Sequence, residues 1–114
     1  MTPADTAEAL GSGDLPVLGT PRLVALLEKA AVAVARPRLE EGQTTVGTRI
    51  DLEHVAPSAV GAVVEAEAAL VEADGRRLRF DVRATMGGVE IARGTHERAI
   101  VDVGRFMARV EAGR

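Results

Sequence analysis

Residues 20–36, TPRLVALLEKAAVAVAR, decide the fold, because their apolar side chains recur at the spacing of an α-helix. Thr20 is a good N-cap, Pro21 is tolerated at the first helical position, and Pro37 bounds the segment. The pattern predicts a helix over about residues 21–36. Apolar positions cover most of its circumference, which is typical of a buried central helix; they are Leu23, Leu26, Leu27, Ala30, Ala31 and Val34.

Downstream of the helix, alternating apolar and polar residues predict a meander of long antiparallel strands. Asp74-Gly75 and Gly87-Gly88 mark turns between neighbouring strands. Leu78, Phe80 and Val82 fall on one face of such a strand. We expect strands over residues 44–55, 62–73, 77–86 and 89–102, and a short C-terminal helix around Phe106, Met107 and Val110.

One buried helix followed by such strands gives an α+β fold. A sheet of few strands cannot close on itself, so we expect it to wrap the helix on one face. The outer edge of that sheet then exposes unpaired backbone groups. Pairing two chains edge to edge would satisfy these groups in one continuous sheet, and the sequence therefore predicts a homodimer or a higher oligomer.

Composition limits the chain to one domain and excludes several kinds of site. With 114 residues and 46% apolar content it can build one core, so we expect a single domain over 1–114 with an N-terminal loop region over 1–19. Two Phe and no Trp or Tyr predict a core of small and β-branched side chains. The absence of cysteine excludes a disulfide framework, a cysteine-bound metal and a thiol nucleophile, and fits a cytoplasmic protein.

Charge and hydropathy argue against two classes of partner. The net charge is −3 and there is no run of Lys or Arg, which disfavours nucleic acid binding. The N-terminus lacks the basic and apolar regions of a signal peptide, and no apolar run approaches the ~20 residues of a membrane span. We therefore expect neither a nucleic acid nor a membrane partner.

Glu28 is the most informative residue of the helix. A helical ion pair would need a base three or four positions away, but all four of those neighbours are apolar: Val24, Ala25, Ala31 and Val32. An unpaired carboxylate on an apolar face costs several kcal/mol. Two interpretations stay open: Glu28 lies on a solvated edge beside Lys29, or it is a partly buried functional carboxylate.

His54 is the second candidate. Period-2 counting places it on the face of Val46, Ile50 and Leu52, which should face the helix. The simpler interpretation is a core histidine that a backbone carbonyl satisfies. The alternative is that helix and sheet bring His54 toward Glu28, because a carboxylate and an imidazole in an apolar pocket form a general acid–base pair.

The remaining polar residues give weaker signals. Thr20 is an N-cap on any interpretation, and its hydroxyl could face the same pocket, since helix N-termini stabilise developing oxyanions. His96 shows no clear inward or outward pattern, so we treat it as structural or undetermined. Two histidines on separate elements are weak support for a metal site, and no glycine cluster matches a phosphate-binding fingerprint.

A series of short motifs resembles the hot-dog thioesterase family related to fluoroacetyl-CoA thioesterase. The similarity runs in order and with compatible spacing from about residue 17 to residue 110. The motifs are Val17-Leu18-Gly19-Thr20-Pro21 with Glu28 eight residues after the Thr, Leu39-Glu40-Glu41-Gly42, Val46-Gly47-Thr48, His54 followed by Ala56-Pro57, Glu72-Ala73-Asp74-Gly75-Arg76-Arg77-Leu78 and Gly94-Thr95-His96-Glu97-Arg98-Ala99.

The resemblance implies a hot-dog fold, with a sheet wrapped around a long helix and active sites at a dimer interface. It places the family's catalytic Thr, Glu and His on Thr20, Glu28 and His54, and a substrate-binding glycine on Gly47. It also implies an acyl-CoA substrate and chemistry that requires no metal or other cofactor.

This sequence departs from the family pattern in two respects. The chain begins where a first strand would normally have just ended, so we expect a sheet one strand short or a misassigned start site. The fluoroacetyl-selective members carry aromatic lid residues before the Thr, whereas residues 11–16 contain no aromatic side chain. That difference argues against fluoroacetyl selectivity and leaves the acyl group open.

The leading hypothesis is hydrolysis of a small or medium acyl-CoA to the free acid and CoA. His54 would activate water or relay a proton to and from Thr20, while Glu28 would stabilise the imidazolium or attack as a nucleophile. The alternatives are a non-catalytic acyl-CoA or small-ligand binding module on the same fold and a purely structural dimerisation domain.

Overall fold

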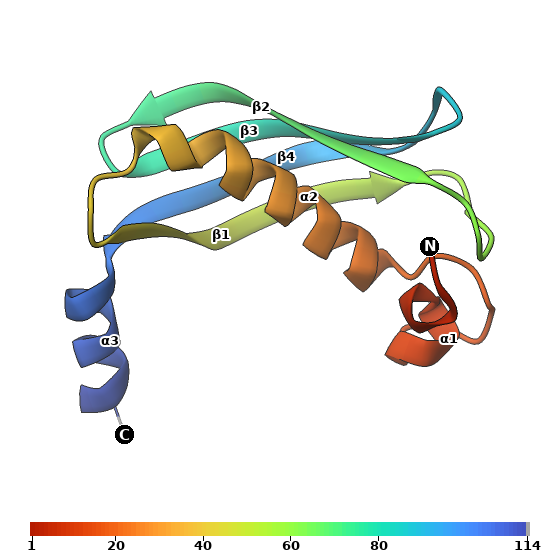
Figure 1. Cartoon of the computed structure of the whole chain (residues 1–114), viewed down its shortest axis with the longest axis horizontal. Helices are drawn as coiled ribbons and strands as arrows, with labels where there is room; N and C mark the ends of the chain where they lie inside the picture. Colours follow the sequence, from red (N-terminus) through yellow and green to blue (C-terminus); the bar gives the residue numbers. More distant parts are fainter. Residues whose placement is uncertain (114) are drawn as a thin grey trace.

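A four-stranded antiparallel sheet lies behind one long helix (Figure 1). The computed structural model describes residues 1–113. The chain order is η1 (Pro3–Asp5), α1 (Ala7–Leu10), α2 (Thr20–Ala35), η2 (Arg36–Arg38), β1 (Gln43–His54), β2 (Val64–Asp74), β3 (Arg77–Met86), β4 (Val89–Asp102) and α3 (Val103–Ala112). The strand order β1-β4-β3-β2 leaves β1 and β2 at the two edges.

The predicted α+β layout, the four strands and the C-terminal helix are confirmed. The core lies between α2 and the sheet, and β3 contributes Leu78, Phe80 and Val82 to it from one face, as alternation predicts. None of the described helices combines the length and the apolar character that crossing a membrane requires.

The central helix is buried along one stripe rather than all round. Only Leu23, Leu27, Ala31 and Ala35 are buried, at a spacing of four residues. Val34, which the sequence pattern assigned to the core, is 37% exposed. Apolar content alone therefore overestimated the burial of α2, because a sheet on one side of a helix covers only the stripe that faces it.

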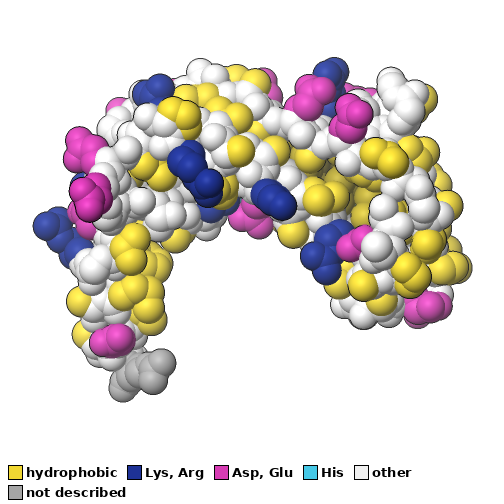
Figure 2. Space-filling view, in the orientation of Figure 1, with side chains coloured by type: hydrophobic (Ala, Val, Ile, Leu, Met, Phe, Trp, Pro, Cys, Tyr) yellow, Lys and Arg dark blue, Asp and Glu magenta, His cyan; other side chains and the backbone are white. Residues whose placement is uncertain are grey.

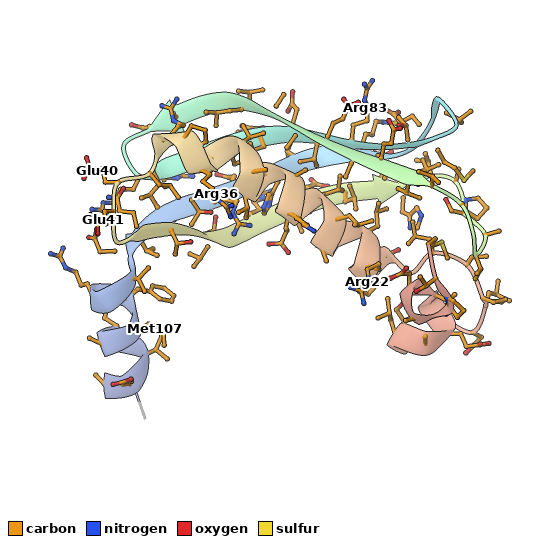
Figure 3. The ribbon with its side chains drawn as sticks, in the orientation of Figure 1. Arg22, Arg36, Glu40, Glu41, Arg83 and Met107 are labelled. Atoms are coloured by element: carbon orange, nitrogen blue, oxygen red, sulfur yellow. The ribbon has the colours of Figure 1, made fainter. Side chains whose placement is uncertain are left out.

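The N-terminal region is more ordered than the predicted loop. η1 and α1 lie within it, and the Thr6 side chain caps α1 by accepting a hydrogen bond from the Ala9 N–H at 3.1 Å. The Thr2 backbone N–H donates to Asp5, which lowers the pKa of the Asp5 carboxyl. Arg22 of α2 pairs with the same carboxylate at 3.0 Å and ties this region to the helix (Figure 3).

A β-bulge in β1 changes which side chains face α2. The register with β4 shifts between Gly47 and Arg49, so Thr48 is an extra residue. Ile50 and Leu52 keep their predicted face, but Thr45 replaces Val46 on it. The predicted inward position of Val46 is wrong, because simple period-2 counting does not include the inserted residue.

Candidate active site

The hydroxyl of Thr20 and the imidazole of His54 lie together where α2 begins and β1 ends. Thr20 Oγ1 is 2.9 Å from His54 Nδ1, which is a hydrogen-bond distance. One residue comes from the first position of the helix and the other from the last position of an edge strand. The fold therefore joins two of the predicted catalytic side chains that are 34 residues apart in the sequence.

The second nitrogen of the His54 ring is unusual among the described groups. His54 Nε2 is buried and has no hydrogen-bond partner. If Nδ1 accepts the proton of the Thr20 hydroxyl, Nε2 carries a proton with no acceptor; in the other tautomer, Nε2 is an unused acceptor. A buried polar atom without a partner is uncommon and costs roughly 1–3 kcal/mol, which marks this ring as a functional candidate.

Thr20 is not the N-cap that the sequence predicted. Gly19 holds the cap position with extended φ and ψ, and Thr20 is the first residue of α2. The Thr20 hydroxyl therefore makes no cap hydrogen bond and is directed to His54 instead. The glycine fits this position because an added Cβ would lie 3.0 Å from the Cα of Ala7.

Glu28 has a charged partner that its helical neighbours could not reveal. Its Oε2 accepts a hydrogen bond from Arg98 Nη1 of β4 at 3.0 Å. The side chain of Glu28 is 40% exposed, whereas that of Arg98 is 7% exposed. The structure therefore supports the interpretation of Glu28 as a partly buried carboxylate, and its counter-charge comes from the sheet.

Arg98 is fixed by a network of buried hydrogen bonds. Its Nε donates to Thr45 Oγ1 at 2.9 Å and its Nη2 donates to the Thr45 carbonyl at 3.1 Å. Its Nη1 also lies 3.1 Å from His96 Nε2. His96 Nδ1 lies 2.7 Å from the Arg49 carbonyl, which can only accept, so Nδ1 carries the proton and Nε2 accepts from Arg98.

Gly47 leaves the space in which this cluster is assembled. A Cβ at position 47 would lie 2.6 Å from Glu28 Oε2, 3.2 Å from Arg98 Nη1 and 3.4 Å from His96 Cε1. Glycine is therefore required here for the observed position of the Glu28 carboxylate. The role of Gly47 toward a substrate stays a prediction.

Glu28 and His54 do not meet within one protomer, so that prediction is wrong for a single chain. Glu28 lies eight residues beyond Thr20, which is about 12 Å along the helix axis. It lies against Gly47, whereas His54 is seven residues further along β1 and pairs with Ala92. One chain therefore presents two separate clusters, Thr20–His54 and Glu28–Arg98.

The Thr20–His54 pair borders an open pocket of about 280 Å³, whose other walls include Ser12, Val17 and Pro57. A larger hollow of about 530 Å³ lies elsewhere, on the sheet face away from α2. It has no histidine, and several of its charges are already paired, such as Arg83 with Glu67. The smaller pocket is the candidate active site, because it holds the hydrogen-bonded hydroxyl and imidazole.

Within residues 1–113, no group of three or more His, Asp or Glu side chains is arranged to hold a metal ion. Sequence reasoning missed Arg98 and Thr45 and left His96 undetermined. Two signals point to them in retrospect: Arg98 is two residues after His96 and so shares its face of β4, and Gly47 lies opposite Arg98 in the register. The bulge after Gly47 hid this pairing from the sequence.

Comparisons with known proteins show the family and the fold of this chain. The fluoroacetyl-CoA-specific thioesterase (FlK) family matches residues 1–104. A fluoroacetyl-CoA thioesterase from Streptantibioticus cattleyicolor is 40% identical over 94 residues, which make up 82% of this chain and 68% of that protein. A crystal structure of FlK aligns with a TM-score of 0.93 at 35% identity and covers 100% of this chain and 89% of that chain.

A hot-dog-like protein from Thermanaerovibrio acidaminovorans aligns with a TM-score of 0.89 at 24% identity, covering 98% of this chain and 83% of that chain. At this identity the likeness shows the fold alone. The family match covers most of the sequence, and the first relative exceeds the similarity at which family membership is clear. This chain therefore belongs to the fluoroacetyl-CoA-specific thioesterase family and has the hot-dog fold.

Proposed function

We propose that this protein hydrolyses the thioester of a small acyl-CoA, with Thr20, His54 and Glu28 as its catalytic residues. The observation that carries the proposal is the 2.9 Å contact between Thr20 Oγ1 and His54 Nδ1 beside an open pocket. Family membership supports thioester chemistry, and solved structures of FlK variants contain acetyl-CoA or fluoroacetate with CoA.

His54 acts as the general base in this proposal. It removes a proton from the attacking water, either directly or through the Thr20 hydroxyl, and the water oxygen bonds to the acyl carbon. The positive end of the α2 dipole at Thr20 supports negative charge on the carbonyl oxygen. When the carbon–sulfur bond breaks, the imidazolium returns the proton to the CoA sulfur, and the free acid leaves.

Glu28 reaches the imidazole of a second protomer in this proposal. The edge strand β1 has a free side, and antiparallel pairing with β1 of another copy would join the two sheets. A register centred between Ile50 and Asp51 sets His54 opposite the partner's Gly47, against which the partner's Glu28 lies. The carboxylate then stabilises the imidazolium, and Gly47 lets a substrate approach the same place.

The Arg98 contact favours this electrostatic role of Glu28 over nucleophilic attack. Oε2 is already held by the guanidinium at 3.0 Å, which stabilises the charge that a nucleophile would have to give up.

We propose a homodimer with two such composite sites. The cysteine-free sequence supports the cytoplasm as the proposed location.

The acyl group is proposed to be small but not restricted to fluoroacetyl. Residues 11–16, which precede Thr20 and contribute Ser12 to the pocket, contain no aromatic side chain. The aromatic lid expected of fluoroacetyl-selective members is therefore missing from this segment, so the name of the relative does not fix the substrate.

The test is hydrolysis of acetyl-, fluoroacetyl-, butyryl- and hexanoyl-CoA by the purified protein, measured as the release of the free CoA thiol. We expect turnover that falls by ~10²–10⁴ in His54→Ala, the usual cost of losing a general base. Arg79→Ala, on an exposed part of β3, is the control. If all four thioesters bind but none is hydrolysed by the folded dimer, the protein is an acyl-CoA binding module instead.

A further inference from the structure

The C-terminal helix α3 has an apolar face that is largely exposed, although Phe106 on it is partly buried beside Arg76 and Ile100 of the same chain. Val103, Met107 and Val110 are 43%, 45% and 46% exposed, and Phe106 lies between them on the same face. Their spacing of three and four residues forms one continuous stripe. An isolated helix shorter than about 12–15 residues is marginal in water, so a ten-residue helix of this kind needs a partner surface.

The place of α3 in the fold narrows the choice of partner. The Val103 N–H donates to the Gly42 carbonyl at 2.9 Å, which fixes the start of α3 beside the start of β1. Figure 1 shows α3 projecting past the β1 edge at one end, while α1 projects past it at the other. In Figure 2 the apolar side of α3 faces the hollow between these two arms.

A second copy of the chain fits this hollow because β1 forms its floor. β1 is hydrogen-bonded only to β4 in the sheet, so its outer side can accept another strand. Antiparallel pairing with β1 of a second copy brings the start of one strand to the end of the other. Since α3 begins beside the start of β1, it would then lie beside the partner's His54.

The end of β1 offers the matching surface. Val55 directly follows His54, lines the Thr20–His54 pocket and is 49% exposed. Leu15, in the loop between α1 and α2, is 64% exposed. In a two-fold symmetric dimer, the apolar face of α3 of each chain would therefore cover the exposed end of β1 of the other chain, so that this contact would occur twice. Apolar burial supplies the main gain in such an interface.

We propose that α3 of each protomer closes the Thr20–His54 pocket of the other and that Phe106 forms an aromatic wall of the acyl site. The other phenylalanine, Phe80, is fully buried in the core and cannot serve. The proposal rests on the proposed thioesterase function for its substrate. Its consequence is that a helix at the C-terminus sets the acyl-chain preference of an active site on another chain.

Cysteine cross-linking tests the position of α3 without any need for activity. The natural chain has no cysteine, so introduced thiols report without background. We expect Met107→Cys and Val55→Cys chains, purified together as a mixed dimer, to form an interchain disulfide under mild oxidation. Arg105→Cys, whose native side chain is 83% exposed, replaces Met107→Cys in the control. Cross-linking of the control alone, or of neither pair, would overturn the proposed position.

Mixed dimers then test the role of Phe106. We expect Phe106→Ala to change the ratio of kcat/KM between hexanoyl- and acetyl-CoA by about tenfold or more, the usual effect of altered packing in an apolar pocket. A mixed dimer of Phe106→Ala and His54→Ala chains has one intact site only if α3 acts on the other chain. It should regain the wild-type chain-length ratio with about half of the wild-type turnover.

The result that would contradict this role is a mixed dimer that keeps the ratio of the Phe106→Ala homodimer, or a Phe106→Ala protein with the wild-type ratio. These outcomes differ from failure of the thioesterase proposal, in which the wild-type protein itself hydrolyses none of the thioesters. Arg105→Ala, on the opposite side of α3, should keep the wild-type ratio and turnover.

Discussion

A substitution of Thr20 can test catalysis separately from the stability of α2, because Gly19 rather than Thr20 caps this helix. Thr20→Val keeps the side-chain shape and removes only the hydrogen bond to His54. We expect turnover to fall by about 10²-fold or more, as for loss of a proton-transfer group. The free energy of unfolding should change by less than ~0.5 kcal/mol, the usual range for a substitution that removes no core contact.

Thiol release and urea unfolding measure these two quantities, and Thr20→Ser, which restores the hydroxyl, should recover turnover to within a few-fold. A loss of 1 kcal/mol or more in Thr20→Val, comparable to that of a lost cap, would show that the hydroxyl has a structural role in α2.

Gly47 gives a second prediction at the scale of one residue. In Gly47→Ala the new methyl group would lie 2.6 Å from Glu28 Oε2, so the flexible carboxylate must move away from Arg98. We expect the protein to fold and turnover to fall by about tenfold or more, because electrostatic groups act only when correctly placed. A crystal structure of the variant would show the displaced carboxylate, and the thiol-release assay would give kcat.

Gly104→Ala is the matched control for this substitution. A Cβ at position 104 meets no heavy atom within 4 Å, and the residue lies inside α3. Alanine there should raise the free energy of unfolding by roughly 0.5–1 kcal/mol without changing turnover. Wild-type kcat in Gly47→Ala would mean that the exact position of Glu28 does not matter for catalysis.

At the scale of elements, the bulge in β1 organises the Glu28–Arg98 cluster. It lets Thr45 and Gly47 share the inner face with Ile50, so that Arg98 can lie over Gly47 and bind Thr45. Without the extra residue, Gly47 would point away from α2 and the carboxylate of Glu28 would lose its space. A local irregularity of one residue therefore decides which polar groups surround Glu28.

The close contact between β1 and β4 predicts one position that tolerates no side chain. A Cβ on Gly94 would collide with the Asp51 carbonyl oxygen, which belongs to the backbone and cannot rotate away. We expect Gly94→Ala to lower the free energy of unfolding by ~3 kcal/mol or more, at the upper end for overpacking. Urea unfolding measures the loss.

The neighbouring substitution Arg93→Ala provides a comparison on the same strand. Arg93 makes exposed ion pairs with Glu53 and Glu90, and exposed pairs contribute about 0–1 kcal/mol. Its loss should therefore be small. Equal destabilisation by Gly94→Ala and Arg93→Ala would show that the two strands can separate at this point without cost.

At the scale of the whole molecule, the proposed composite site joins two half-sites that come from different chains. Thr20–His54 lies where α2 begins and β1 ends, whereas Glu28–Arg98 lies further along α2 against Gly47 of β1, so both are near the free edge of the sheet. The same pairing of edges that joins the half-sites would also cover α3. Catalysis, oligomerisation and acyl selectivity are thus proposed to depend on one interface.

Mixed dimers of Glu28→Gln and His54→Ala chains test whether Glu28 acts across that interface. The turnover of each homodimer should be ~10²–10³-fold lower than that of the wild-type protein. If Glu28 serves the partner's His54, the mixed dimer contains one complete site and recovers about half of wild-type turnover. Two affinity tags isolate the mixed species for the thiol-release assay.

Sedimentation should show a dimer at micromolar concentration for every variant. A mixed dimer as inactive as the two homodimers would show that Glu28 does not serve the partner's His54. Because Arg98 is buried and loses its counter-charge in Glu28→Gln, unfolding must be measured in parallel; we expect a loss of about 1–2 kcal/mol, reduced by the partial exposure of Glu28.

The sequence by itself determined the elements and the chemical groups. Helical spacing from Leu23 to Val34 and turns at Asp74-Gly75 and Gly87-Gly88 predicted the α+β layout, because these signals are local. Local patterns singled out Glu28 and His54, and the colinear motifs added Thr20. The structure brings Thr20 and His54 together and places Glu28 elsewhere.

Only the tertiary structure decided how those groups are paired. The partner of Glu28 lies 70 residues away on β4, and the cap of α2 moved by one residue to Gly19. The bulge at Thr48 reversed the strand alternation before it, so counting residues placed Val46 on the wrong face. These outcomes depend on strand register and on which backbones approach each other, and such non-local contacts leave no periodic signal in the sequence around each residue.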